Sequence, residues 1–194
     1  MRQPVMLSLP ANLAQVVNVM SPFAGTWAIA GGWAIDLWLG RQTRTHADVD
    51  IAVCRDEQSL LRATFEDWQF SKAVDGKLVP WPRNEVLRLP DHEIHASTPN
   101  GPKVELLLNE RRDDVWLFRR NTAIELPMSR AVQRAQGVPV LAPEIVLLYK
   151  SKNPRATDDD DFAAALPSLD DGSRSWLRSA ITRTAGPSSW SENL

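Results

Sequence analysis

The apolar positions of the chain change their spacing several times, and each change predicts a new element of secondary structure. Residues 11–20 carry apolar side chains at helical spacing. The short apolar run at residues 26–30 is flanked by turn formers, which predicts a buried strand. Residues 33–39 are densely apolar and end at Gly40, which predicts a helix with a glycine stop. The chain therefore begins with a helix, a strand and a second helix.

Two later stretches alternate apolar and polar residues with the period of a strand. Between residues 47 and 53 every second residue is Val or Ile, and Asp48 and Asp50 take the opposite face. In residues 103–109, Glu105 alternates with apolar residues that would pack inward. The pattern predicts two strands, each of which presents carboxylates on one face.

The rest of the chain predicts further helices and an irregular central segment. Gly and Pro interrupt residues 70–97, so this stretch is interpreted either as short strands or as a long active-site loop. Helices are expected at residues 56–68, 145–150, 157–166 and 170–184.

Together these elements predict an α/β (α+β) fold with a small mixed sheet, flanking helices and a C-terminal helical extension. The chain has 194 residues and 43% hydrophobic content, which is enough to bury a sizeable core. Its character changes after residue 141, so we expect a main domain at residues 1–141 and a helical region at 142–185. The polar residues 186–194 are a candidate flexible tail.

The turn between the predicted strand and helix contains Gly31 and Gly32. Glycine lets backbone N–H groups approach an anion closely, and a helix N-terminus adds partial positive charge. This turn favours a phosphate ligand, although a glycine pair alone is also typical of an ordinary tight turn.

The acidic pair lies next to an apolar face that must be buried. Asp48 and Asp50 on one face cost stability unless cations share that face. Two oxygen-liganded Mg²⁺ ions would balance the pair. The alternative is a solvated sheet face with acids at the start of a strand.

The block of residues 31–53, GGWAIDLWLGRQTRTHADVDIAV, resembles the signature of the antibiotic nucleotidyltransferases. It is most similar to that of the aminoglycoside 2″-adenylyltransferases and the lincosamide nucleotidyltransferases, which belong to the polymerase-β-like nucleotidyltransferase superfamily. Besides the glycines and the two aspartates, the matching residues are Trp33, Asp36, Gly40, Arg41, Thr43, Arg44 and His46. The resemblance implies that residues 1–141 form a nucleotidyltransferase catalytic domain.

This resemblance also implies a third carboxylate on a neighbouring strand. Glu105 is the best candidate, as a metal ligand with Asp48 and Asp50, as the base that accepts a hydroxyl proton, or as both. Asp91 and Glu93 are rivals because they also alternate with other residues.

The implied reaction moves a nucleoside monophosphate, AMP from ATP by preference, onto a hydroxyl with release of pyrophosphate. Gly31, Gly32 and Arg44 are candidates to bind the nucleotide, with Arg41 as a weaker one. Either arginine is alternatively a surface charge near a helix end.

A second segment resembles the helical portion of related bacterial nucleotidyltransferases. It consists of Lys150, Arg155, Asp158, Asp161 and Phe162. Lys150 is accordingly a candidate triphosphate ligand, or a helix-end lysine that offsets the helix dipole. The two aspartates either bind a cationic acceptor, as Glu144 would, or cap the helix and pair with nearby cations.

The histidines and the cysteine carry weaker signals. His46 either orients a ligand or loop or packs structurally. His92 and His95 would point to opposite faces of a strand, so shared metal ligation is not expected. Cys54 is the only cysteine, which excludes an intrachain disulfide and fits a small buried residue.

Composition narrows the class of partner. A net charge of −2 argues against a nonspecific nucleic-acid binder, although the pairs Arg111–Arg112 and Arg119–Arg120 keep RNA open as an acceptor. The sequence has no signal pattern and no membrane-spanning apolar run, so we expect a cytoplasmic protein without a membrane partner.

Three functions follow in order of preference. The first is Mg²⁺-dependent nucleotidyl transfer to a hydroxyl of a small molecule, such as an aminoglycoside or lincosamide antibiotic. The second is a toxin-type nucleotidyltransferase that acts on tRNA or protein. The third is a nucleotide-binding regulatory module without catalysis, which the intact acidic residues disfavour.

Overall fold

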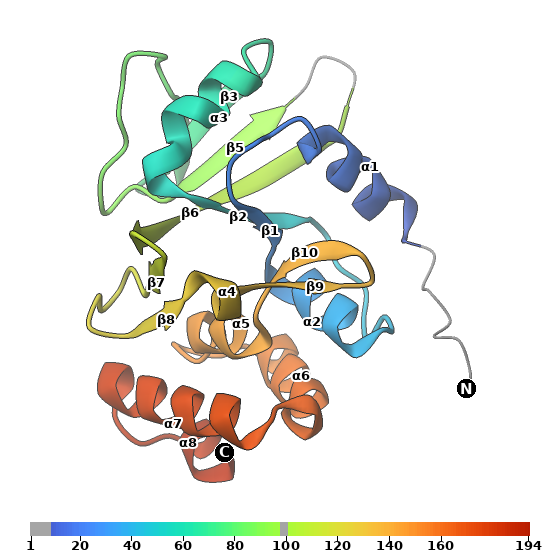
Figure 1. Cartoon of the computed structure of the whole chain (residues 1–194), viewed down its shortest axis with the longest axis vertical. Helices are drawn as coiled ribbons and strands as arrows, with labels where there is room; N and C mark the ends of the chain where they lie inside the picture. Colours follow the sequence, from blue (N-terminus) through green and yellow to red (C-terminus); the bar gives the residue numbers. More distant parts are fainter. Residues whose placement is uncertain (1–8, 98–100) are drawn as a thin grey trace.

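The computed structural model describes residues 9–97 and 101–194, and its described part contains one extended mixed sheet with helices packed around it (Figure 1). The strands are β1 (Trp27–Ile29), β2 (Asp50–Cys54), β3 (Gln69–Val74), β4 (Lys77–Pro80), β5 (Glu93–Ser97), β6 (Lys103–Arg112), β7 (Val115–Leu117), β8 (Glu125–Pro127), β9 (Val132–Ala135) and β10 (Val138–Leu141). Their order is β4-β3-β5-β6-β2-β1-β10-β9, with β7 and β8 branching from β6.

The helices are α1 (Ala11–Met20), α2 (Gly31–Leu39), α3 (Gln58–Thr64), α4 (Met128–Ala131), α5 (Pro143–Lys150), α6 (Ala156–Ala165), α7 (Asp171–Ala185) and α8 (Ser189–Asn193). Figure 1 shows α5 to α8 gathered at one end of the molecule beside α2, with α3 at the opposite end. This arrangement confirms the expected α/β class with a C-terminal helical region. No helix in the described residues is both long enough and apolar enough to cross a membrane.

The central segment and the third helix differ in detail from the sequence pattern. Residues 69–80 and 93–97 contain the short strands β3, β4 and β5, while residues 81–92 between β4 and β5 are a loop, so both expected features are present. The helix expected at residues 56–68 is shorter, since α3 ends at Thr64. Phe65 leaves the helical conformation and its ring stacks on Trp68 at 4.1 Å, so aromatic packing replaces the last helical turn.

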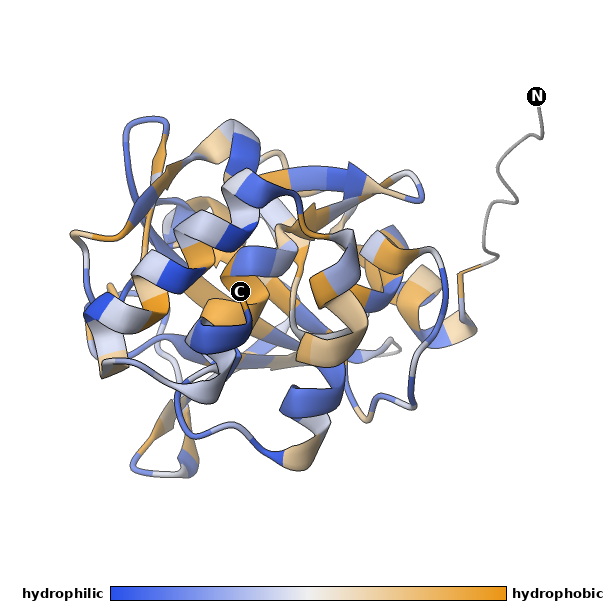
Figure 2. Cartoon of the chain, turned by 90° about the horizontal axis from the view of Figure 1, so that it is seen from below, coloured by the Kyte–Doolittle hydropathy of each residue, from blue (hydrophilic) through white to orange (hydrophobic). Residues whose placement is uncertain are grey.

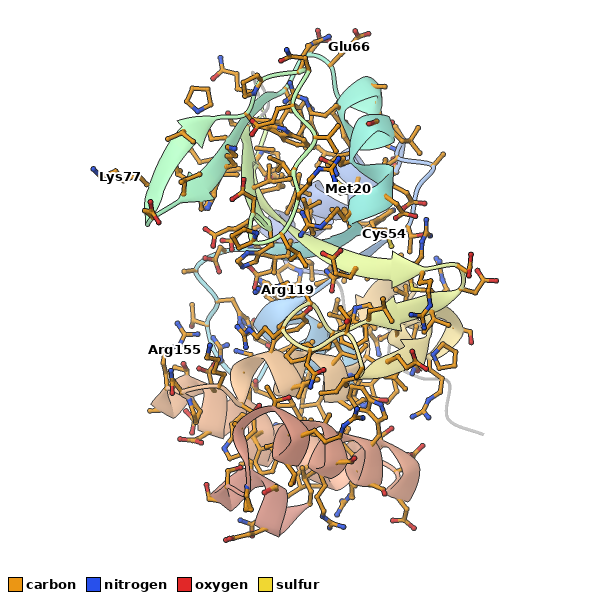
Figure 3. All side chains as sticks on the ribbon, turned by 90° about the vertical axis from the view of Figure 1, so that its left-hand side faces the viewer. Met20, Cys54, Glu66, Lys77, Arg119 and Arg155 are labelled. Atoms are coloured by element: carbon orange, nitrogen blue, oxygen red, sulfur yellow. The ribbon has the colours of Figure 1, made fainter. Side chains whose placement is uncertain are left out.

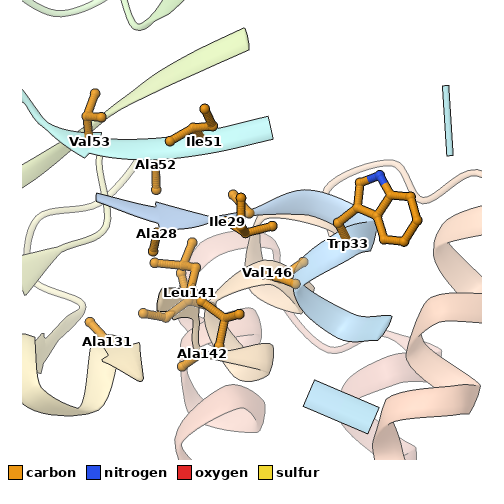
Figure 4. Packing of buried hydrophobic residues seen from close by; sticks show 14 of the residues in the cluster. Ala28, Ile29, Trp33, Ile51, Ala52, Val53, Ala131, Leu141, Ala142 and Val146 are labelled. Atoms are coloured by element: carbon orange, nitrogen blue, oxygen red, sulfur yellow. The ribbon is translucent and has the colours of Figure 1, made fainter. Parts of the chain in front are cut away.

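The core is centred on β2, because both faces of this strand are covered. Ile51 and Val53 lie on one face and Ala52 on the other, and all three are buried (Figure 4). β2 pairs antiparallel with β1 and parallel with β6. Three strands are therefore held in fixed register around the acidic end of β2.

The C-terminal residues are packed against the helical region. Residues 186–194 were a candidate flexible tail, but they contain the helix α8. Trp190 is buried, its ring stacks on Phe162 at 4.4 Å, and its indole N–H donates to Asp159 at 2.7 Å. Figure 2 shows hydrophilic and hydrophobic residues mixed along these helices, as expected when each has one buried face. Trp190 and the buried Leu194 anchor this otherwise polar segment.

We expect Trp190→Ala to lower the free energy of unfolding by about 3 kcal/mol, because it removes a buried ring and leaves a cavity beside Phe162. Urea denaturation followed by circular dichroism measures this change. Glu192→Gln, on the exposed side of the same helix, is the control and should have little effect. Equal stability of both variants would show that the segment contributes nothing to folding.

Candidate active site

The carboxylates come together because β2 and β6 run parallel in register. Asp50 is the first residue of β2 and lies directly opposite Glu105 of β6. Asp48 is exposed and lies in a bend two residues before Asp50, so β2 begins later than the alternation predicted. The charge of Asp48 nevertheless acts on Asp50 and Glu105, which places Asp48 at the same end of the sheet.

The charges of these acids affect one another. Burial raises the pKa of Glu105 to about 7, and the nearby negative charges of Asp50, Glu93 and Asp48 add to the effect. Burial also raises the pKa of Asp50, with the charge of Asp48 as the next cause. The neighbouring cations therefore do not compensate the negative charge at this point of the sheet.

Glu93 and His95 of β5 complete the acidic cluster. His95 lies opposite Glu105 in the antiparallel pair of β5 and β6, and its Nε2 is 2.8 Å from Glu93 Oε1. One ligand atom from each of Glu93, His95 and Glu105 can lie within 4.8 Å of the others. Of the two rival acids, Glu93 lies at the cluster, while Asp91 pairs with Lys72. The alternation of residues along β5 places Glu93 and His95 on one face. Only the pairing of β5 with β6 shows that this face also carries Glu105.

Gly31 allows α2 to begin against Asp50. Its φ is +59°, and a Cβ at this position would overlap Asp50 Oδ2 and lie 3.0 Å from Asp50 Cγ. Any larger residue is excluded by both the conformation and the space. The glycine thus brings the backbone at the helix start into contact with the carboxylate.

Gly32 is required for a different reason. A Cβ at Gly32 would overlap the imidazole of His46 and the guanidinium of Arg44. His46 packs against Trp33 at a ring distance of 4.5 Å, and its Nε2 lies 2.6 Å from the buried Asp36. These contacts favour the loop-orienting role for His46, because they fix the loop that leads into β2.

An ion-pair network joins this loop to the C-terminal helices. The guanidinium of Arg44 donates to both carboxylate oxygens of Asp161, at 2.8 and 2.9 Å. Lys150 Nζ is 3.1 Å from Asp161 and 2.6 Å from Asp158. Arg155 donates its backbone N–H and its side chain to Asp158, which caps α6. Asp158 and Asp161 thus take the capping and pairing roles.

These ion pairs also lower the pKa values of the two aspartates. Burial alone would raise the pKa of Asp158, but hydrogen bonds from Arg155 and Lys150 outweigh it and hold this pKa well below its usual range. The Arg44 hydrogen bond likewise outweighs burial at Asp161 and lowers its pKa. Both aspartates are therefore charged, and their charge is balanced by cations of this chain.

A cavity of about 300 Å³ opens beside Gly31 and Asp50 and extends to the C-terminal helices. Its cationic lining residues are Arg119, Arg120, Lys150, Lys152 and Arg155. The guanidinium carbons of Arg119 and Arg120 lie 5.3 and 5.5 Å from the ring centre of Tyr149, which also lines the cavity. Figure 3 shows Arg119 between the sheet and the C-terminal helices. We call this space the cationic cavity.

Other sequence candidates lie outside this cavity. Arg111 pairs with Asp56, and Arg112 pairs with Glu125. Glu144 is buried and contacts Arg130 and Ser173, so it does not line the cationic cavity. Cys54 is buried as expected, and burial raises the pKa of its thiol to about 11.

Sequence comparison identifies one family for most of the chain. The family model of the aminoglycoside-2″-adenylyltransferases matches residues 12–165, which is more than half of the sequence. No curated protein sequence matches the chain.

Two sets of solved structures share the fold. The crystal structure of ANT(2″)-Ia in complex with adenylyl-2″-tobramycin superposes with a TM-score of 0.56 at 16% identity, over 89% of this chain and 96% of that one. The solution structure of ANT(2″)-Ia gives a TM-score of 0.55 at 19% identity, over 88% and 89% of the two chains. The lincomycin-bound lincosamide adenylyltransferase LnuA gives 0.57 at 16% identity, over 83% of this chain and 98% of that one.

The raised pKa of Glu105 makes stability depend on pH. Its folded value of about 7 exceeds its ordinary 4.5, so folding favours the protonated form. The contribution is complete below about pH 4.5 and is lost as the pH rises through 7. We expect Glu105→Gln to raise the free energy of unfolding at pH 8 by about 1 kcal/mol, a figure discounted for solvent screening.

This gain should vanish near pH 4, where the parent Glu105 is itself protonated. Urea midpoints at both pH values, measured with a metal chelator present, test the difference. Glu66→Gln replaces an exposed acid and is the control. A Glu105→Gln gain of the same size at pH 4 and pH 8 would contradict the electrostatic explanation.

Proposed function

Because the chain belongs to the aminoglycoside-2″-adenylyltransferase family, we propose that it transfers AMP from ATP to a hydroxyl of a small molecule in a Mg²⁺-dependent reaction. Membership makes it a nucleotidyltransferase of the antibiotic-modifying type. The observation that carries the finer proposal is the pairing of Asp50 with Glu105, together with the position of Asp50 and Gly31 in the lining of the cationic cavity. In this proposal residues 1–141 supply the carboxylates, and residues 142–185 supply Lys150.

We assign the metal, Mg²⁺, to Asp48, Asp50 and Glu105, which offer carboxylate oxygens at one end of the sheet, with Glu93 and His95 beside Glu105. Carboxylate oxygens are the ligands this ion prefers, and the raised pKa values of Asp50 and Glu105 indicate negative charge that the chain leaves uncompensated. When bound, two such ions supply Lewis-acid stabilisation of the phosphate oxygens. The three carboxylates are the residues that would hold them.

In this proposal the nucleotide occupies the cationic cavity, which Asp50 also lines. Arg119, Arg120 and Lys150 line the cavity and offer N–H donors to phosphate oxygens, whereas Gly31 offers a close backbone approach. Arg44 supports the site indirectly in this proposal, since its ion pair with Asp161 orients Lys150. Gly32 supports it by making room for Arg44.

Glu105 is the proposed base. The proton of the acceptor hydroxyl moves to a carboxylate oxygen of Glu105 as the hydroxyl oxygen bonds to the α-phosphorus of ATP. The bond from that phosphorus to the bridging oxygen breaks in line, and pyrophosphate leaves. The position of Glu105 suits this role, because it lies directly opposite Asp50 in the register of β2 and β6.

An RNA acceptor is less well supported by the structure than a small-molecule acceptor. It depended on two arginine pairs, but Arg111 and Arg112 are engaged by carboxylates of the chain. Arg119 and Arg120 line the same cavity as Gly31 and Asp50, where they suit the nucleotide. These contacts favour a small-molecule acceptor over a polyanion.

Asp50→Asn should lower kcat for AMP transfer at least about 100-fold, because it removes a charge that holds the metal beside the reacting phosphate. The measurement is the mass gain of an acceptor incubated with ATP and Mg²⁺, together with pyrophosphate release. Asp67→Asn removes an exposed aspartate after α3 and serves as the matched control. Unchanged turnover in Asp50→Asn would refute the assigned site.

Arg119→Ala should raise KM for ATP roughly 10-fold or more, because it removes charge-assisted hydrogen bonds to phosphate. Arg112→Ala is its control, since Arg112 is an exposed arginine paired with Glu125 at the surface. Equilibrium binding of ATP with Mg²⁺ separates this effect from one on chemistry. Equal ATP affinity in the two variants would exclude Arg119 from the nucleotide site.

A further inference from the structure

His95 belongs to a row of polar side chains that crosses four neighbouring strands. The pairing of β2 with β6 sets Asp50 opposite Glu105, and the pairing of β6 with β5 sets Glu105 opposite His95. The pairing of β5 with β3 continues the row to Ser71. Residues that pair across neighbouring strands point to the same face, and the strands lie about 4.8 Å apart. The row therefore places an imidazole next to the carboxylates assigned to Mg²⁺.

Glu93 shares this face, because it lies two positions before His95 on β5. The ligand atoms of Glu93, His95 and Glu105 all lie within 4.8 Å of one another. His95 Nε2 is already 2.8 Å from Glu93 Oε1. Two ligand atoms that bind one ion at about 2.1 Å and at a right angle are roughly 3 Å apart, so this pair needs little movement to hold an ion. We call these three residues the imidazole cluster.

The imidazole cluster is accessible from solvent. The side chains of Glu93 and His95 are 36% and 37% exposed, and both residues line a cavity of about 480 Å³. Rotation about their side-chain bonds can therefore shorten the contacts with Glu105 to the roughly 3–4 Å that separates ligand atoms on one ion. The cavity also admits an incoming ion together with its water ligands.

The lysines and arginines of the chain do not balance the negative charge of this cluster. In the described residues Glu93 forms its ion pair with His95, and neither Glu105 nor Asp50 forms one. A neutral imidazole offsets little of the repulsion between neighbouring carboxylates. A divalent cation bound between them would turn this repulsion into attraction.

The donor atoms determine which divalent ion fits the imidazole cluster. Mg²⁺ prefers oxygen ligands in near-ideal octahedral geometry and gives up its water ligands reluctantly. An imidazole nitrogen with carboxylate oxygens instead suits Zn²⁺ and related transition metals. His95 would bind through Nε2 as the neutral imidazole with its proton on Nδ1. The ion then takes the place of the proton between Nε2 and Glu93.

We infer that Glu93, His95 and Glu105 form a second metal site, which prefers a divalent transition metal of the Zn²⁺ type over Mg²⁺. Three protein ligands leave the fourth position of a tetrahedral ion to water. The site shares Glu105 with the set assigned to Mg²⁺, whereas Glu93 and His95 distinguish it from Asp48 and Asp50. Metal binding at this site requires neither nucleotide nor acceptor.

Calorimetric titration of Zn²⁺ into the whole nucleotide-free protein, with Mg²⁺ in excess, tests the second site. We expect His95→Gln to weaken Zn²⁺ binding at least about 10-fold, a loss that is typical even of residues that only support a metal ligand. His92→Gln is the matched control, since His92 lines the same cavity but its Nδ1 is 2.8 Å from the backbone oxygen of Pro90. Equal Zn²⁺ affinity in these two variants, or no Zn²⁺ binding by the parent, overturns the inference.

Two further variants separate the second site from the aspartates. Glu93→Gln should weaken Zn²⁺ binding more than Mg²⁺ binding, which is measured in a titration without Zn²⁺. Asp48→Asn should have the opposite preference. A loss of Zn²⁺ affinity in Asp48→Asn as large as that in His95→Gln would place the ion at the aspartates and contradict a second site. None of the three side chains is buried, and circular dichroism checks that each variant keeps the parent fold.

Because Glu105 is shared, Zn²⁺ at the second site should also slow AMP transfer, a consequence that rests on the proposed function. With free Zn²⁺ buffered and Mg²⁺ in excess, the fractional inhibition should be smaller in His95→Gln than in the parent. If the parent binds Zn²⁺ through His95 but transfers no AMP, the proposed function fails and the second site stands. If the parent transfers AMP but His95→Gln binds Zn²⁺ equally well, the proposed function stands and the second site fails.

Discussion

The register of β2 between β1 and β6 is the constraint on which the site depends. Pairing Ile29 with Ile51 brings the start of α2 beside Asp50, and pairing Asp50 with Glu105 sets the two carboxylates side by side. A shift of one residue would turn Ile51 out of the core and turn the carboxylate inward. The apolar core thus fixes the register, and the register concentrates negative charge at one end of the sheet.

This concentration of negative charge has a cost that the proposed metal ions would offset. Like charges and burial raise the pKa of Asp50 and Glu105, so the metal-free fold is strained electrostatically at neutral pH. The two buried acids of α6 show the opposite arrangement, because Asp158 is paired with Arg155 and Lys150 and Asp161 with Arg44. Acids that organise structure are balanced internally, whereas acids proposed to act in chemistry are left for a ligand to balance.

How much the sequence predicted depends on the range of each interaction. Local patterns were enough for the strand–glycine–helix unit, for β2 and for β6, because side-chain period and glycine chemistry act over a few residues. The fold class followed from these elements. The positions of Arg119 in the cationic cavity and of His95 beside Glu105 could not be predicted locally, since each depends on contacts between segments that are distant in the sequence. Trp190 was missed for a related reason, because its polar neighbours conceal one aromatic ring that packs on Phe162.

The ion pair between Arg44 and Asp161 joins a locally predicted segment, the loop before β2, to a helix that is distant in the sequence. Arg44 lies in the loop before β2, and Asp161 lies 117 residues later in α6, yet the two side chains are joined by two hydrogen bonds. Removing water from such a pair is costly, so the pair is weak evidence for stability by itself. Its geometric effect is clearer, because Asp161 also contacts Lys150 at the edge of the cationic cavity. The loop that delivers Asp48 and the helix that delivers Lys150 are thereby held in one arrangement, which couples the proposed metal side of the site to its proposed phosphate side.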